Sequence, residues 1–196
     1  MPSDQIYKGQ EVNLTARDPG LRTAFVGIGW DAPEQYEGYA VDIDASAFVL
    51  KRDGKVRSDT DFVFYNNLIA ADQAVRHNGD NITGFGEGDD EVIEVDLNVL
   101  PYDVDRISFA VTVHNAEERG QTFGLIKNAF IRVVNKQTGV ELARFDLSED
   151  ASDENGMVFG EIFRNGPDWN FRAIGEGTNG GLYRIARNYG VNVAPP

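Results

Sequence analysis

The residues of this sequence best suited to chemistry are carboxylates, and many of them gather in one glycine-rich stretch. The segment GDNITGFGEGDDE, residues 79–91, holds five acidic residues and four glycines, and no lysine or arginine lies between Arg76 and Arg106. Calcium takes roughly six to eight oxygen ligands in flexible geometry, and glycine lets a backbone carbonyl turn toward an ion because it tolerates positive φ. The stretch therefore predicts a calcium-binding loop. Its candidate ligands are Asp80, Asn81, Thr83, Asp89, Asp90 and Glu91.

This stretch does not fit two familiar loop types. An EF-hand needs oxygen ligands at its third and fifth positions and a glycine at its sixth, where this loop has Ile82, Gly84 and Phe85. A phosphate-binding loop needs a lysine or a helix N-terminus close by, and here acidic residues follow the glycines instead. A solvated loop that binds no ion remains the alternative, because runs of charge usually face water.

A second group of acids lies in VDIDAS, residues 41–46. Alternate residues of a strand share a face, so Asp42 and Asp44 point the same way while Ile43 and its alternates face the core. Two neighbouring carboxylates repel each other unless a cation or hydrogen-bond donors separate them. Both are therefore candidate calcium ligands, with an exposed strand edge as the alternative. Asn66, the first of the two asparagines that end DFVFYNN, is a weaker candidate because asparagine pairs more often form turns.

The residue inventory restricts the metal and the chemistry. The 196 residues include no cysteine and only two histidines. Thiolate metal sites, iron–sulfur clusters and thiol redox chemistry are thereby excluded, and a histidine-rich zinc or iron site is not expected. Any bound metal must accept oxygen ligands. A chain without cysteine or a dinucleotide-binding fingerprint is also a poor candidate for redox catalysis.

The charge of the chain is strongly negative and unevenly distributed. The net charge is −14, of which residues 1–106 contribute −12 through 21 acidic and 9 basic residues. Nucleic-acid binding leaves a basic footprint that is not visible here, so no nucleic-acid partner is expected. No apolar run reaches the roughly 20 residues of a transmembrane helix, and the start MPSDQIYKGQ lacks the features of a secretory signal. We expect a cytoplasmic protein whose natural partners are cations.

Short strands must position these acids. Apolar segments rich in β-branched and aromatic residues alternate with turn residues, which predicts a mainly β fold. We expect a two-sheet β-sandwich, built as one domain over residues 1–196. Residues 68–76 and 97–103 have weaker patterns typical of short helical turns, and Asp53-Gly54 predicts a hairpin turn. The expected strands lie in residues 22–30, 39–50, 61–65, 91–97, 106–114 and 126–134 and in the segments that follow.

The clearest helical pattern is close to the C-terminus, in TNGGLYRIARNYG. Its apolar residues fall on one face at helical spacing, which predicts a short packing helix. Thr178 or Asn179 is expected to cap its start and Gly190 to end it. The apolar face would consist of Leu182, Ile185, Ala186 and Tyr189.

Taken together, these motifs resemble the TerD family of tellurite-resistance and general stress proteins. The likeness is carried by GIGWD at 27–31, DIDASAFVL at 42–50, DFVFYNN, GDNITGFGEGDDE and the long segment from EVIEVDLNVLPYD to IRVVN. ELARFDLSED, MVFGEIFR and FRAIGEG continue it, so the resemblance covers roughly residues 22 to 192. The acidic motifs are long, which makes chance agreement an inadequate explanation.

The resemblance implies a calcium-binding β-sandwich with ions held among the acidic loops at one end. The implied ligands are Asp42, Asp44, the acids of residues 79–91 and Asn81. More than one calcium ion per chain is expected, because the carboxylates exceed what one ion needs. The family is not an established enzyme family. Its members are linked to resistance to tellurite and other stresses, as parts of larger, membrane-associated assemblies.

The sequence thus predicts a calcium-binding stress-response protein that acts as a non-catalytic sensor or scaffold with protein partners. Two alternatives remain open. One is a calcium-dependent binder of membranes or carbohydrates, in which Phe85 between the acids contacts the ligand. The other is a metal-dependent hydrolase, because carboxylates and a hard cation can activate water. The absence of a catalytic motif favours the non-catalytic role.

Overall fold

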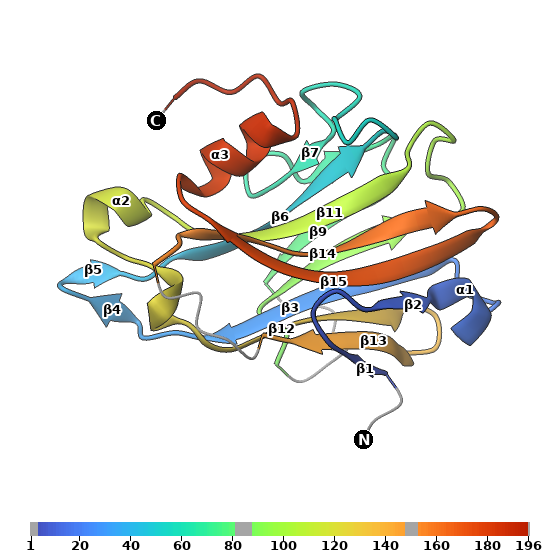
Figure 1. Cartoon of the computed structure of the whole chain (residues 1–196), viewed down its shortest axis with the longest axis horizontal. Coiled ribbons are helices and arrows are strands. Elements are labelled where there is room, and N and C mark those ends of the chain that lie inside the picture. The colour runs from blue at the N-terminus through green and yellow to red at the C-terminus, as the bar shows by residue number, and fades with distance from the viewer. Residues whose placement is uncertain (1–3, 81–87, 148–152, 196) are drawn as a thin grey trace.

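The computed structural model describes residues 4–80, 88–147 and 153–195, and it contains two large sheets that pack face to face as a β-sandwich (Figure 1). The predicted mainly β sandwich is therefore confirmed. In spatial order the first sheet consists of β1 (Gln5–Ile6), β13 (Glu141–Asp146), β12 (Lys127–Asn135), β3 (Thr23–Asp31), β10 (Glu91–Asp96), β9 (Val75–Asp80) and β8 (Ile69–Ala70). The second sheet consists of β2 (Glu11–Asn13), β15 (Asp168–Thr178), β14 (Gly156–Asn165), β11 (Arg106–Val113), β6 (Ile43–Leu50) and β7 (Phe62–Val63).

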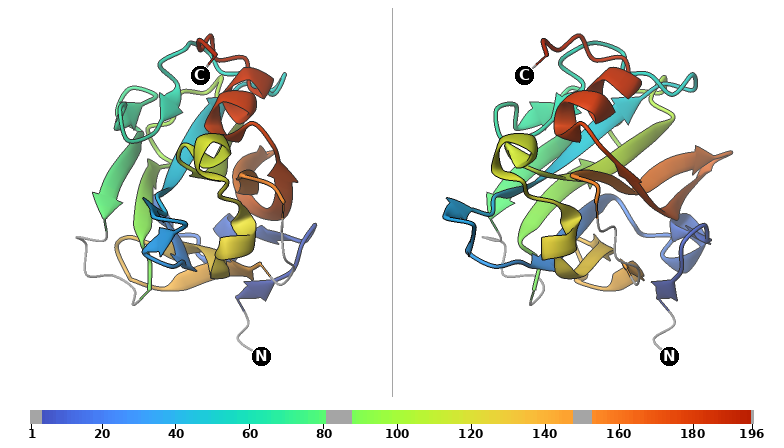
Figure 2. Two further views of the ribbon diagram at one scale, coloured as in Figure 1. Left: turned by 90° about the vertical axis from the view of Figure 1, so that its left-hand side faces the viewer. Right: turned by 60° about the vertical axis from the view of Figure 1, so that its left-hand side comes forward.

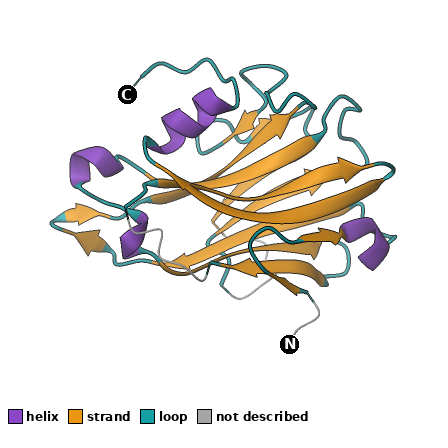
Figure 3. Ribbon diagram, in the orientation of Figure 1, coloured by secondary structure: helices purple, strands orange, loops and turns teal. Residues whose placement is uncertain are grey.

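The remaining elements are short, as Figure 3 shows. The strands β4 (Gln35–Tyr36) and β5 (Tyr39–Ala40) form a separate hairpin at the end of the sandwich seen at the left of Figure 1. The helix α2 lies at the same end, and Figure 2 turns this end toward the viewer. The helical elements are α1 (Leu14–Arg17), α2 (Ala116–Arg119), the 3-10 turn η1 (Phe123–Leu125) and α3 (Gly181–Asn188).

Alternation along the strands builds the core between the sheets. In β6, Ile43, Ala45 and Ala47 are buried in the main core, whereas Phe48 belongs to a second cluster on the opposite face of the sheet. Asp44 occupies that opposite face as well, because successive strand residues point to alternate sides. The predicted placement of Ile43, Ala45 and Asp44 is therefore confirmed, whereas Asp42 precedes the strand.

The outer face of the second sheet is covered by α3, as the apolar pattern predicted. Ile185 and Ala186 of this helix are buried against Phe48, and Gly190, with a φ of +84°, lies just past its end. The start differs from the expectation. Gly180 occupies the N-cap position, and Asn155 caps the helix because its Oδ1 accepts a 2.8 Å hydrogen bond from the Gly181 amide.

Both short segments with weak helical patterns form turns and strands instead. Residues 68–76 contribute β8 and β9, joined by a turn in which Ala71, Asp72 and Gln73 all have positive φ (50°, 53° and 72°). Residues 97–103 leave β10 without forming a helix. At the predicted hairpin Gly54 does turn the chain, with a φ of +75°, but only the isolated bridge between Leu50 and Val56 flanks it.

Each sheet ends on very short strands. The N-terminal segment contributes β1 to the first sheet and then β2 to the second, so one piece of chain borders both sheets on one side. On the other side β7 and β8 border the second and the first sheet in the same way. Within the described residues no helix is long and apolar enough to cross a membrane.

Candidate functional site

Several of the acids singled out in the sequence lie near one another, on both sheets, at the end of the sandwich that carries the β4–β5 hairpin. Asp42 immediately precedes β6 of the second sheet and Asp44 is the second residue of that strand, whereas Asp90 immediately precedes β10 of the first sheet and Glu91 begins it. Asp31 ends β3, whose Ile28 pairs with Glu91. We call Asp31, Asp42, Asp44, Asp90 and Glu91 the acidic corner.

The carboxyl group of Asp44 has a raised pKa in this arrangement. Its side chain is 18% exposed. Burial, followed by the charges of Asp42 and Glu91, raises its pKa to about 6, although His114 and His77 oppose the shift. The nearest basic group is the Nδ1 atom of His114, 4.0 Å from the Asp44 carboxylate. Mutual repulsion of the VDIDAS carboxylates, expected from the sequence, is thus present and is strengthened by Glu91 from the other sheet.

Asp90 is fixed by backbone contacts with β3. Its amide donates to the Ile28 carbonyl at 2.9 Å, and its Oδ2 accepts from the Trp30 amide at 2.7 Å. Burial raises the pKa of Asp90. The Trp30 amide counteracts this shift, and the charges of Asp31 and its acidic neighbours add to it. Asp90 is therefore a well-positioned carboxylate in a negative environment.

Asp89 has a partner that the sequence pattern did not reveal. Arg132 of β12 donates two hydrogen bonds to its carboxylate, both at 2.8 Å, and a third to Glu141 at 3.0 Å. The Asp89 carboxylate lies directly over Gly27, where a Cβ atom would come within 2.4 Å of it. Arg132 is 43 residues from Asp89 in the chain, and strand pairing places it opposite Gly27. This carboxylate is therefore compensated by a bidentate ion pair.

The side chains of Glu91 and His77 form hydrogen bonds with the backbone at the edge of β6. The strand β7 pairs only with Ala47 and Phe48, which leaves the outward-facing amide and carbonyl of Ala45 without a strand partner. Glu91 Oε2 accepts from the Ala45 amide at 2.6 Å, and His77 Nε2 lies 3.2 Å from the Ala45 carbonyl and 3.1 Å from Glu91 Oε2. His77 Nδ1 accepts from the Gly79 amide at 2.9 Å, so Nε2 carries the proton that is shared between Ala45 and Glu91.

This contact links the two sheets beside Asp44. Although burial opposes the shift, the hydrogen bond and charge of Glu91 raise the pKa of His77. The side chain of His77 is only 4% exposed, which makes its polar contacts difficult to replace by water. His77 and Glu91 therefore connect the β9–β10 hairpin of the first sheet to the strand of the second sheet that carries Asp44.

Replacing His77 by alanine is expected to lower the free energy of unfolding by about 1–3 kcal/mol, because it leaves the Ala45 carbonyl and Glu91 without their donor. Urea denaturation followed by tryptophan fluorescence measures this change. The matched control is His114→Ala, since the side chain of His114 is 36% exposed and its loss is expected to cost only about 0.5 kcal/mol. Equal destabilisation by the two variants would show that the contact with Ala45 has no special role.

The remaining predicted ligands do not all lie near the acidic corner or within the described residues. Asn66 is exposed in the turn that follows Phe64, at the edge near β7 and β8. The backbone of Asp80 pairs with Glu91, while Asn81 and Thr83 lie outside the described residues. Within residues 4–80, 88–147 and 153–195, no three His, Cys, Asp or Glu side chains converge closely enough to hold a metal ion.

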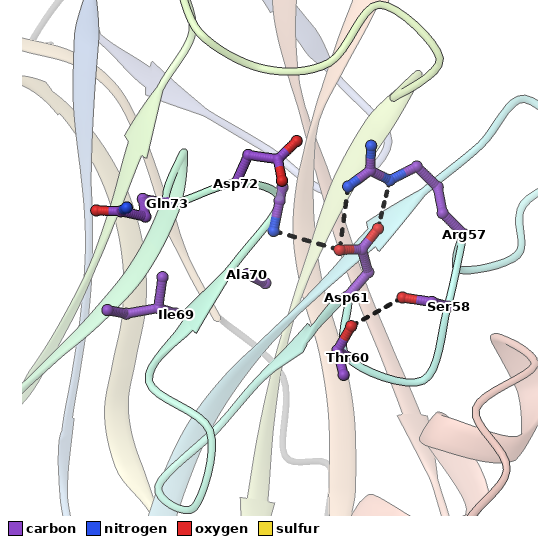
Figure 4. Close-up of a pocket in the computed structure, with 9 residues that line it drawn as sticks. Arg57, Ser58, Thr60, Asp61, Ile69, Ala70, Asp72 and Gln73 are labelled. Carbon is purple, nitrogen blue, oxygen red and sulfur yellow. Dashed lines mark hydrogen bonds and ion pairs between the residues drawn. The ribbon is translucent and has the colours of Figure 1, made fainter.

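A separate hollow of about 410 Å³ lies beside Asp61, and Figure 4 shows its side chains. Asp61 accepts hydrogen bonds from Arg57 and, at 3.2 Å, from the Ala71 amide. The guanidinium of Arg57 also reaches Asp103 at 3.2 Å. Asp61 is buried and is partnered by Arg57 and the Ala71 amide, so it holds the left-handed turn that begins at Ala71.

One known protein family accounts for the fold and the acidic motifs together, because its model matches nearly the entire chain. The model of the TerD domain family matches residues 3–189. The chain belongs to the TerD family. It is 48% identical to the tellurium resistance protein TerD of Serratia marcescens over 98% of this chain and 100% of that protein. It is 49% identical to general stress protein 16U of Bacillus subtilis, over 96% of this chain and 97% of that protein.

Two solved structures of low sequence identity share the fold. A protein of unknown function superimposes with a TM-score of 0.67 at 23% identity, over 85% of this chain and 95% of that one. A homologue of the telluride resistance protein TerD from Streptomyces coelicolor gives a TM-score of 0.66 at 21% identity, over 85% and 96% of the respective chains. The family is one of tellurium-resistance and general stress-response proteins, and the names of the relatives above describe resistance and stress rather than a reaction.

Proposed function

We propose that this protein binds calcium at its acidic corner and acts as a non-catalytic sensor or scaffold in the stress response. The observation that carries the proposal is the approach of carboxylates from both sheets, among which Asp42, Asp44 and Asp90 have no lysine or arginine partner within the described chain. The pKa of Asp44 is raised to about 6. Burial is the main cause of this shift, and the charges of Asp42 and Glu91 add to it. Partly buried carboxylates that face like charges are natural ligands for a hard divalent cation.

The contacts divide the predicted ligands into two groups. Asp42, Asp44 and Asp90 have carboxylates available for an ion, and the candidate oxygens of Asp80, Asn81 and Thr83 would complete the coordination sphere. Asp89 is engaged by Arg132. Glu91 Oε2 is engaged by Ala45 and His77. We therefore assign these last two carboxylates a positioning role, with more than one calcium ion held by the others.

Calcium at this corner would act on the whole molecule through charge. A chain with a net charge of −14 repels itself and other acidic surfaces. Because the carboxylates belong to opposite sheets, a bound ion would neutralise them and order the loops that connect the sheets at this end. A protein partner could then recognise the calcium-bound form, which is the property required of a sensor or scaffold.

Calcium titration by calorimetry, with magnesium as competitor, tests the proposal. Asp44→Asn and Asp90→Asn, one from each sheet, are each expected to weaken calcium binding more than roughly tenfold, the lower end of what even outer-sphere partners of a metal contribute. Asp72→Asn removes the same charge from an exposed aspartate at the β8–β9 turn and is expected to leave calcium affinity unchanged. Wild-type protein that shows no saturable binding below about 1 mM, the weakest range of natural calcium modules, would refute the proposal.

A further inference from the structure

We propose that the groove between α2 and α3 is a docking site for a basic segment of a partner protein, an inference that rests on the proposed scaffold role. The groove has a volume of about 520 Å³ and lies on the outer face of the second sheet. Its floor includes Thr112 and Val113 at the end of β11, and its two walls are α2 with the residues before it and the first residues of α3. We call it the α2–α3 groove.

The groove offers apolar and aromatic surface for an anchoring side chain. Tyr65, Ala116, Leu182 and Tyr183 line it. The Tyr65 ring meets the ring of His114 edge to face at 5.8 Å, which leaves a half-buried aromatic wall. Buried aromatic and aliphatic anchors in pockets of this kind supply most of the affinity of a peptide interface.

Charge decides which partner fits. The carboxylates of Asp44, Glu117 and Glu118 line the groove, and no lysine or arginine is among its described lining residues. Among the described lining residues the basic group is His114, whose Nδ1 lies 4.0 Å from the Asp44 carboxylate. Arg119 of α2 points elsewhere, because its guanidinium donates to the Ala40 carbonyl at 3.2 Å. A segment with lysine or arginine beside an apolar residue would satisfy both the acids and the apolar walls.

The same charge disfavours the competing occupants. A second copy of this chain carries the same net charge of −14, so its approach to an acidic groove is opposed by repulsion. Nucleic acids and anionic lipid surfaces have the same sign and are opposed for the same reason. A basic protein segment is the occupant that the electrostatics of the groove select.

The walls of the groove are held in place in the free protein. At the start of α3 the Gly181 amide is capped by Asn155 at 2.8 Å, and Ile185 and Ala186 anchor the helix to the second sheet. After α2, Gln121 donates to the Ala40 carbonyl at 3.0 Å. A preformed groove requires little reorganisation on binding, which favours measurable affinity for a short segment.

The test uses a fluorescein-labelled nine-residue peptide that alternates lysine with leucine, measured by fluorescence anisotropy. Two comparison peptides replace every leucine by serine or every lysine by glutamate. We expect the lysine–leucine peptide to bind, the serine peptide to bind at least about tenfold more weakly because it lacks anchors, and the glutamate peptide not to bind. Binding is measured in EDTA and again in calcium, because Asp44 belongs to both the groove and the acidic corner.

Matched variants locate the binding. Glu117→Gln/Glu118→Gln is expected to weaken the lysine–leucine peptide about tenfold, and Tyr183→Ala by a similar factor. Glu34→Gln/Glu37→Gln removes the same charge from the neighbouring exposed hairpin, and Tyr102→Ala removes a ring that is 95% exposed. Both controls are expected to bind as the wild type does.

Three results would overturn the inference. They are equal affinity of the groove variants and their controls, stronger binding of the glutamate peptide, and self-association of the wild type that the groove variants abolish, which would assign the groove to a second copy. Because Glu117 and Glu118 lie outside the acidic corner, peptide binding in EDTA supports the groove even where calcium titration fails. Calcium binding without peptide binding refutes the groove and leaves the proposed function standing.

Discussion

Replacing Arg132 by leucine is expected to lower the free energy of unfolding by about 3–5 kcal/mol, because it leaves a buried carboxylate without its countercharge. The Asp89 side chain is only 4% exposed, and Arg132 holds both of its oxygens. Glu141 loses a 3.0 Å contact in the same variant. Equilibrium urea denaturation measures the change, provided that the dependence on urea concentration keeps the same slope.

A double variant separates the ion pair from the packing of its side chains. Arg132→Leu/Asp89→Leu removes both charges and is expected to recover most of the lost stability, since a buried ion pair and an apolar pair of similar volume are often close in free energy. Lys51→Leu breaks an exposed pair with Asp53 and is expected to cost less than about 1 kcal/mol. A value for Arg132→Leu in that same small range would show that Asp89 reaches water.

Replacing Gly29 by alanine is expected to cost about 3 kcal/mol or more, the upper range for overpacking a filled site. A Cβ atom at Gly29 would lie 2.2 Å from the Gly88 carbonyl oxygen and 2.4 Å from the Phe130 ring. The carbonyl is backbone, so relief requires movement of the segment that carries Asp89 and Asp90. Under the proposed function the same variant therefore loses calcium affinity more than roughly tenfold.

Urea denaturation and calcium calorimetry on the same preparation check both effects of Gly29→Ala. Gly20→Ala is the matched control, because its Cβ would meet only the Asp18 carboxylate, at 3.2 Å, at the end of a flexible side chain. We expect the control to match the wild type in both measurements. If Gly29→Ala were as stable as Gly20→Ala, the close approach of the Gly88 segment to β3 would be disproved.

The fold is largely predictable because its strands follow local rules. The alternation of residues in β6 is enough to assign Ile43 and Ala45 to the core and Asp44 to the other face, where they lie. The α3 helix is equally predictable from its apolar spacing. Its cap is not, since Asn155 reaches Gly181 across 26 residues and no local pattern signals such a contact. The turn after β8 is unpredictable for a similar reason, because the buried carboxylate of Asp61 holds its left-handed residues.

The sequence predicts which residues belong to the candidate site better than it predicts the contacts that each of them makes. The family resemblance and the acidic spacing identify Asp42, Asp44 and Asp90, all of which lie in the acidic corner. Which acids are free to bind an ion and which are already hydrogen-bonded depends on partners distant in the chain. Asp89 and Glu91 look equivalent to their neighbours in sequence, yet Arg132 and the backbone of Ala45 occupy them. The two glycines of GIGWD are the available signal, because Gly27 and Gly29 make room for the segment that bears these acids.

The very short strands at the edges of both sheets disfavour aggregation at high protein concentration. A long open strand invites another molecule to add to it, and this is how many β-proteins begin to aggregate. Here β1, β7 and β8 are two residues long and β2 is three, so each margin offers only a few backbone groups to a neighbouring molecule. An unfolded polypeptide that meets this protein therefore finds few open strand positions to pair with at these four short strands.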